Sequence, residues 1–145
     1  MPRVSLAFFG AGVLCVLVGM VWGTIMGATQ DHSMSPAHAH LNLLGFVALS
    51  IMGTFYALAG DRAPIRLAWV NFVLSFGGVL IVIPMLAQIL AGNTALGPLM
   101  AIPELMIIGG AGCFLAAIVM VWRRTGVSVA DAPAAKVDAA RMAAE

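Results

Sequence analysis

Four long stretches of apolar residues dominate this sequence, and each is long enough to cross a lipid bilayer as a helix. A transmembrane helix needs about 20 mainly apolar residues. The stretches cover about residues 4–28, 36–59, 67–91 and 96–122. The first contains no charged residue, and the fourth contains only Glu104. The sequence therefore predicts an all-α membrane protein whose residues 1–124 form a bundle of four transmembrane helices.

The composition agrees with a membrane protein. Of the 145 residues, 62% are hydrophobic and 9% are charged, whereas a soluble domain carries about 25% charged residues. The formal net charge of +1 argues against a nucleic-acid-binding protein, which needs a basic surface. The two cysteines lie far apart, so the sequence has neither a disulfide framework nor the CxxCH motif of covalent haem attachment.

The two ends of the chain differ in character. The first apolar stretch has about 25 residues, which exceeds the 7–15 of a signal peptide, so we expect it to remain as a span. After the fourth stretch the composition changes, because residues 125–145 are rich in alanine and contain no aromatic residue. We expect this segment to be a cytoplasmic tail that is disordered or forms a frayed short helix.

The basic residues give the predicted bundle an orientation. All seven precede the first span, separate the second from the third, or follow the fourth: Arg3, Arg62, Arg66, Arg123, Arg124, Lys136 and Arg141. Loops rich in lysine and arginine remain in the cytoplasm. We therefore expect a multi-pass protein of the bacterial inner (cytoplasmic) membrane with both termini inside, and with Asp31 and His32 in an outer loop.

Small residues and prolines mark how the spans pack. Gly19, Gly23 and Gly27 form a GxxxGxxxG ridge on the first span. Such ridges let helix backbones approach closely in lipid. The ridge fits either packing within the bundle or the interface of a homo-oligomer, and both remain open. Pro84 and Pro103 lie within the third and fourth spans, where proline can kink a helix.

The few polar side chains within the spans gather toward the outer side. Glu104 lies about eight residues into the fourth span, or ~12 Å at 1.5 Å per residue. Ionisable residues inside a bilayer are costly and tend to mark functional sites. The side chains expected at one shared depth, with Asp31 and His32 above them, are His38, His40, Asn42, Gln88 and Glu104.

The spacing of the histidines restricts how they can act together. At about 100° per residue, His38 and His40 point roughly 160° apart on a regular helix. The two therefore cannot bind one metal ion from the same helix. His38 shares a face with Asn42, and His40 shares a face with Leu44. A site for copper or zinc built from His32, His38 and His40 would need a second segment or a second copy.

Residues 36–56 resemble the second helix of subunit I, the catalytic subunit of haem-copper oxidases, closest to the nitric oxide reductase and cbb3-type branches. The matching residues are His40-Leu41-Asn42, followed by Gly53 and Tyr56. Residues 5–122 also look like small four-span bacterial membrane proteins related to that subunit. The resemblance implies that His40 is an axial ligand of a low-spin haem b. Asn42 or Glu104 would then orient the second ring nitrogen of this ligand.

The chain also departs from that family. The oxidase subunit has many more spans, and its later helices carry the remaining haem and metal ligands. No histidine follows His40 here, so the chain is not expected to be an enzyme on its own. A second axial ligand would come from His32, a methionine, an added protein, or His38 or His40 of another protomer.

Three functions fit these residues. The first is a membrane haem-b protein that transfers electrons or senses a gas ligand near the outer face. The second is a non-catalytic accessory or assembly protein that packs against the subunits of a respiratory complex. The third is a membrane module that binds a metal ion through histidine and methionine. In each case the lipid bilayer surrounds the four spans.

Overall fold

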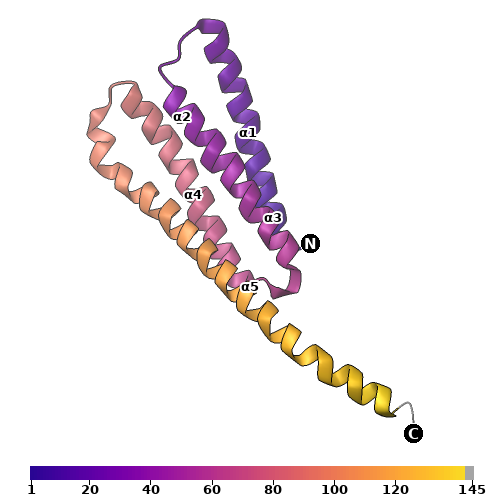
Figure 1. The fold of residues 1–145 in the computed structure, drawn as a ribbon. Coiled ribbons are helices and arrows are strands. Elements are labelled where there is room, and N and C mark those ends of the chain that lie inside the picture. The colour runs from indigo at the N-terminus through magenta and orange to yellow at the C-terminus, as the bar shows by residue number, and fades with distance from the viewer. Residues whose placement is uncertain (143–145) are drawn as a thin grey trace.

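The computed structural model describes the backbone of residues 1–142 and the side chains of residues 1–125. This part of the chain is helical and contains no strand. The elements in chain order are α1 (Arg3–Thr29), α2 (Ser35–His40), η1 (Leu41–Ala48), α3 (Leu49–Ala59), η2 (Gly60–Arg62), α4 (Ile65–Leu90), η3 (Thr94–Met100) and α5 (Ala101–Met142). Figure 1 shows α1 beside the α2–η1–α3 rod, and α4 beside α5.

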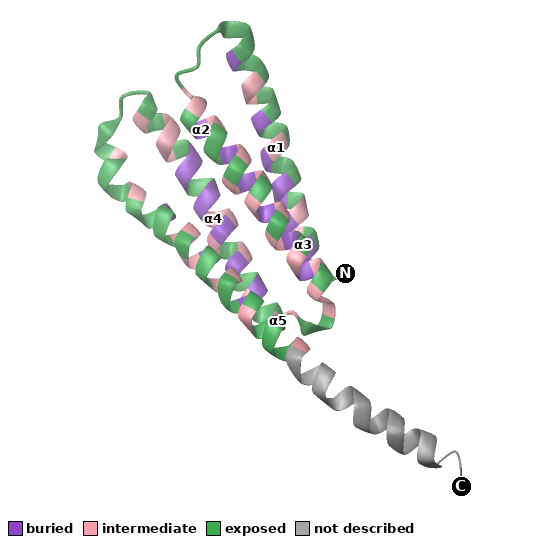
Figure 2. Cartoon of the chain, in the orientation of Figure 1, coloured by how far each residue is buried: buried purple, intermediate pink, exposed green. Residues whose placement is uncertain are grey.

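Four helical segments are long and apolar enough to cross a membrane: Arg3–Thr29, Ser35–Arg62, Ile65–Leu90 and Thr94–Thr125. They agree with the four predicted stretches to within a few residues, which confirms the all-α, four-span prediction. Much of their surface is exposed in the isolated chain (Figure 2), as expected for helices that contact lipid. The prediction for the tail stays a prediction, because side chains after residue 125 lie outside the described part.

Glycine and proline explain several helix boundaries. Gly60 follows α3 with φ of +53°, and Gly92 follows α4 with φ of +102°, conformations that a residue with a Cβ atom rarely adopts. Pro36 stands in the first turn of α2, where the missing N–H costs nothing. Pro103 lies in the first turn of α5, so it marks the start of that helix instead of interrupting the middle of the fourth span.

An aromatic core joins the four spans in the half of the bundle near the start of α1. Phe8 and Tyr56 are fully buried, and their ring centroids lie 5.6 Å apart. Phe72 of α4 meets Phe8 edge-on at 5.1 Å, and Phe114 of α5 meets Tyr56 at 5.9 Å. Aromatic pairs at such distances stabilise a core beyond the area that they bury. This half of the bundle is therefore firmly packed.

The second span contains a π-helical stretch, η1, where the sequence predicted a regular α-helix. From Ala37 to Gly53 the buried residues of this span recur every four positions, and Tyr56 follows after three: Ala37, Leu41, Gly45, Leu49, Gly53 and Tyr56. On an α-helix, steps of four residues would drift by about 40° each. The wider turn of a π-helix takes up extra residues. These buried residues therefore stay against the neighbouring helices along the span. Their four-residue repeat was the sequence feature that could have indicated the π-helical stretch.

Candidate functional site

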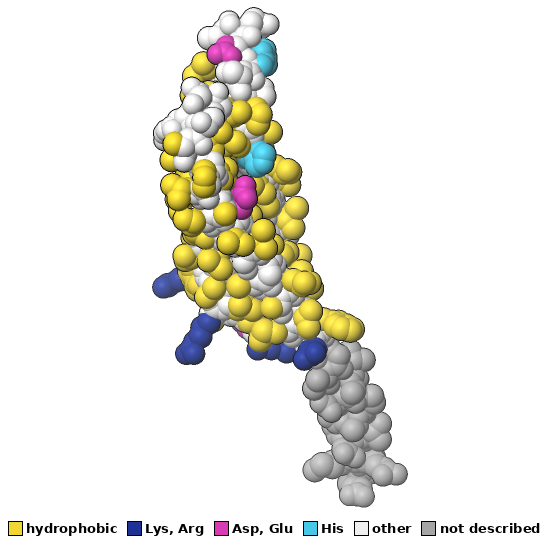
Figure 3. Space-filling view, turned by 90° about the vertical axis from the view of Figure 1, so that its left-hand side faces the viewer, with side chains coloured by type: hydrophobic (Ala, Val, Ile, Leu, Met, Phe, Trp, Pro, Cys, Tyr) yellow, Lys and Arg dark blue, Asp and Glu magenta, His cyan; other side chains and the backbone are white. Residues whose placement is uncertain are grey.

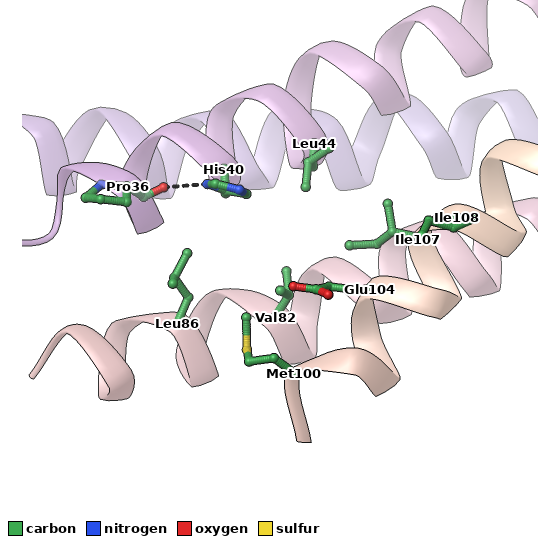
Figure 4. Close-up of a pocket in the computed structure, with 9 residues that line it drawn as sticks. All are labelled: Pro36, His40, Leu44, Val82, Leu86, Met100, Glu104, Ile107 and Ile108. Carbon is green, nitrogen blue, oxygen red and sulfur yellow. Dashed lines mark hydrogen bonds between the residues drawn. The ribbon is translucent and has the colours of Figure 1, made fainter. Parts of the chain in front are cut away.

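His40 ends α2, and the hydrogen bond of its ring decides which nitrogen is free. Its Nδ1 lies 2.7 Å from the carbonyl oxygen of Pro36 (Figure 4). A carbonyl oxygen can only accept a hydrogen bond, so Nδ1 donates and carries the ring proton. In the neutral ring, Nε2 then presents a lone pair. In the described part of the chain, no hydrogen bond engages this Nε2.

The side chain of His40 lines a pocket of about 350 Å³ between the second span, α4 and the start of α5. Most of its walls are aliphatic: Leu44, Val82, Leu86, Ile107 and Ile108. The pocket is open on one side, and both His40 and Glu104 are exposed there. In the view of Figure 3, a histidine and an acidic side chain lie close together among hydrophobic side chains. The pocket therefore opens laterally from within the candidate spans.

Met100 and Glu104 contribute the remaining polar or polarisable groups of this pocket. They lie four residues apart at the junction of η3 and α5, so they project from the same side of the helix start. Figure 4 shows both on the wall opposite His40. A thioether and a carboxyl group thus face an imidazole across one cavity. These three side chains are the ones in the pocket that can bind a metal ion or form hydrogen bonds.

His38 lies on the other side of the second span, against α1, as the spacing predicted. The Asn42 Nδ2 atom donates to the His38 Nε2 atom at 3.1 Å and to the His38 carbonyl oxygen at 3.1 Å. The ring of Trp22 meets the His38 ring edge-on at 6.4 Å. His38 is therefore held by Asn42 and packed on Trp22, away from the pocket that His40 lines. The group that orients the His40 ring is the Pro36 carbonyl, where the sequence suggested Asn42 or Glu104.

Two glycines of the predicted ridge make room for these same side chains. A Cβ atom on Gly19 would collide with the Asn42 amide, and one on Gly23 would lie 3.0 Å from Cε1 of His38. A Cβ atom on Gly27 would have no neighbour within 4 Å. Gly19 and Gly23 therefore serve packing within the chain. A homo-oligomer that uses the ridge stays a prediction.

The outer-loop residues do not join the pocket. His32 is exposed, and its Nδ1 donates to the Gln30 carbonyl oxygen at 3.1 Å. The Asp31 carboxylate accepts the backbone N–H of Ser33 at 2.9 Å, and this bond lowers the pKa of Asp31. Gln88 is exposed and accepts a hydrogen bond from Asn93 at 3.3 Å.

The three histidines are not brought together. Among the described residues, no group of three or more His, Cys, Asp or Glu side chains is placed to hold a metal ion. His32, His38 and His40 lie in the loop, against α1 and in the lateral pocket, respectively. One chain therefore offers no His-rich site for copper or zinc.

A buried chain of hydrogen bonds in the other half of the bundle was not foreseen. The Asn71 Nδ2 atom donates to the Tyr56 hydroxyl at 3.0 Å, and the Ser75 hydroxyl donates to the Asn71 Oδ1 atom at 2.9 Å. Asn71 and Ser75 are buried on one face of α4. Their four-residue spacing within an apolar stretch was the sequence signal for this face. The network joins the buried polar side chains of Tyr56, Asn71 and Ser75, whereas the buried Ser5 hydroxyl has no hydrogen-bond partner among the described residues.

No protein family, no curated protein and no solved structure matches this chain. The similarity of residues 36–56 to oxidase subunit I therefore rests on those residues alone and stays a prediction.

Proposed function

We propose that this protein is a multi-span membrane protein that binds a b-type haem in its lateral pocket, with the His40 Nε2 atom as an axial ligand. The bound haem would supply one-electron or gas-binding chemistry near one face of the membrane. The observation that carries the proposal is the hydrogen bond from His40 Nδ1 to the Pro36 carbonyl. Metal-binding histidines usually donate their second ring nitrogen in this way, which fixes the tautomer and the ring orientation.

The pocket suits such a group in its chemistry. A b-type haem is held by its axial ligands and by apolar packing and needs no covalent attachment motif. Aliphatic side chains from the second span, α4 and α5 supply that packing, among them Leu44, Val82 and Ile107. Because the cavity of about 350 Å³ is open on one side, a flat group larger than the cavity can extend along the groove.

The exposure of the His40 and Glu104 side chains also supports the proposal that a ligand binds in the pocket. In a bilayer, polar atoms without a partner are costly, and ionisable side chains in spans usually serve a function. His40 and Glu104 are exposed at the mouth of an otherwise aliphatic pocket. A bound group in the pocket would cover both side chains and coordinate the free nitrogen of His40.

The charges of the chain suggest which membrane face the pocket serves. The basic side chains visible in Figure 3 gather at one end of the bundle, where Arg124 also donates to the carbonyl oxygen of Arg62 at 2.6 Å. The positive-inside rule assigns that end to the cytoplasm. In the proposed orientation both termini face the cytoplasm, and the pocket lies in the outer half of a bacterial inner membrane.

The optical spectrum tests the haem proposal. The chain is expressed with an ample haem supply and purified in mild detergent, and a reduced-minus-oxidised difference spectrum is recorded. We expect the Soret and α bands of a b-type haem. A protein without these bands contradicts the proposal, and its co-purification with large respiratory subunits would favour the accessory role instead.

A further inference from the structure

We infer that Met100 would hold the proposed haem together with His40, so that a single chain would supply both a histidine and a methionine to the group. This inference rests on the proposed function, because it names the partner of His40 in the same pocket. Three side chains of the pocket carry an atom that can bind iron: His40, Met100 and Glu104. His40 lies on one wall, and the other two lie on the opposite wall (Figure 4).

The position of Met100 lets its sulfur adjust toward His40. Met100 is the last residue of η3 and directly precedes α5. Its side chain has three rotatable bonds and a polarisable thioether. Met100 stands at the end of a 3₁₀ segment, next to the start of α5. The wall opposite His40 therefore offers a flexible thioether that can turn toward a group bound at His40.

Ligand chemistry favours Met100 over Glu104. A thioether is a soft ligand, and histidine with methionine is an established axial pair of electron-transfer haems, which raises their reduction potential. A carboxylate is a hard ligand that suits magnesium, calcium or manganese. Glu104, one turn further along α5, remains a hydrogen-bonding group at the mouth of the pocket.

The other histidines are placed where they cannot compete within one chain. His38 packs against Trp22 of α1, and its ring nitrogen accepts from Asn42. His32 lies in the exposed outer loop and donates to Gln30. A haem held by both His40 and Met100 would be supplied with two protein ligands and would favour electron transfer over the binding of a gas.

The test replaces Met100 by leucine, which keeps the volume and the apolar character of the side chain. The matched control is Met106→Leu, because Met106 lies near Gly77 and outside the pocket. We expect wild type and Met106→Leu to give low-spin electron paramagnetic resonance signals and no carbon monoxide adduct after reduction. Met100→Leu is expected to retain haem, lose the low-spin signal and bind carbon monoxide.

Four results would overturn the ligand inference while leaving haem binding intact. The first is a wild type that is already high-spin, and the second is an unchanged low-spin signal in Met100→Leu. The third is loss of the low-spin signal in Glu104→Gln and not in Met100→Leu. The fourth is one haem for every two chains, which would indicate a ligand from a second copy. A wild type without haem overturns the proposed function itself. Because Met100→Leu is scored only on protein that contains haem, the two failures can be told apart.

Discussion

His38 and His40 stand two residues apart, yet only His40 lines the lateral pocket. Four residues after His38 comes Asn42, whose amide reaches back to the His38 ring at 3.1 Å. Four residues after His40 comes Leu44, which has nothing to donate. The sequence placed Asn42 on the face of His38, because residues four apart are neighbours on a helix, although the resemblance assigned Asn42 to the His40 ring. The approach of Met100 and Glu104 could not be predicted, since it depends on how two distant helices pack.

At the scale of single residues, the buried hydrogen bonds predict a measurable contribution to stability. Tyr56→Phe removes the hydroxyl that accepts the amide of Asn71 at 3.0 Å. We expect the free energy of unfolding in detergent to fall by about 0.6 kcal/mol, the average measured for hydrogen bonds between membrane helices, and by no more than about 1.7 kcal/mol. A double-mutant cycle with Asn71→Ala isolates the bond, and a coupling energy of zero would show that it contributes nothing.

Two glycines of α5 provide a matched pair for the contact between α4 and α5. A Cβ atom on Gly110 would collide with the Ser75 hydroxyl and lie 3.1 Å from the Ser75 backbone nitrogen, whereas one on Gly112 would have no neighbour within 4 Å. We expect Gly110→Ala to lower the free energy of unfolding by about 1–3 kcal/mol, since overpacking forces backbone shifts. Gly112→Ala is the control. Equal free energies of unfolding for the two variants would refute the predicted close contact between Gly110 and Ser75.

At the scale of elements, the sequence predicted the four spans well and the interior of the second span poorly. Length and hydropathy identify a span, but they do not report a change of helical pitch. The change in η1 matters because it lies between His40 and the tightly packed α3. It sets the rotation of α2, and therefore the direction in which His40 points. Such π-helical stretches are frequent at functional sites.

Deleting Leu43, an exposed residue of η1, tests this role. If η1 takes up one extra residue, its loss is expected to convert the stretch to α-helix while α2 keeps its direction relative to α3. His40 should then stay in the pocket, and the haem content per chain should remain close to that of wild type. Leu43→Ala, which removes the side chain but keeps the length, should also retain haem. Loss of haem in the deletion variant alone would contradict the assigned role of η1.

At the scale of the whole molecule, the basic side chains gather at one end of the bundle, and histidine and acidic side chains lie in the other half (Figure 3). The sequence predicted this polarity, because it needs only the order of spans and the positions of charges. The sequence could not predict that the polar side chains expected at one shared depth lie in two separate places. His38 packs against α1, whereas His40 and Glu104 line a lateral pocket. That division follows from side-chain packing across several helices.

The orientation can be measured with single cysteines in a Cys15→Ala/Cys113→Ala background. Ser33 lies in the loop after α1, and Asp61 lies in η2 at the other end of the second span; both are exposed. We expect a membrane-impermeant maleimide to label Ser33→Cys in intact cells and to label Asp61→Cys only after the membrane is opened. The reverse pattern would place the pocket in the cytoplasmic half.

The most direct test of the account compares the haem content of His40→Ala and His38→Ala under identical expression and purification. The two histidines lie at nearly the same depth, but only His40 presents a free nitrogen to the pocket. We predict that His38→Ala retains the haem-to-protein ratio of wild type, whereas His40→Ala loses the Soret and α bands while remaining folded. Equal haem in both variants, or loss in His38→Ala alone, would contradict the assignment of His40 as the ligand.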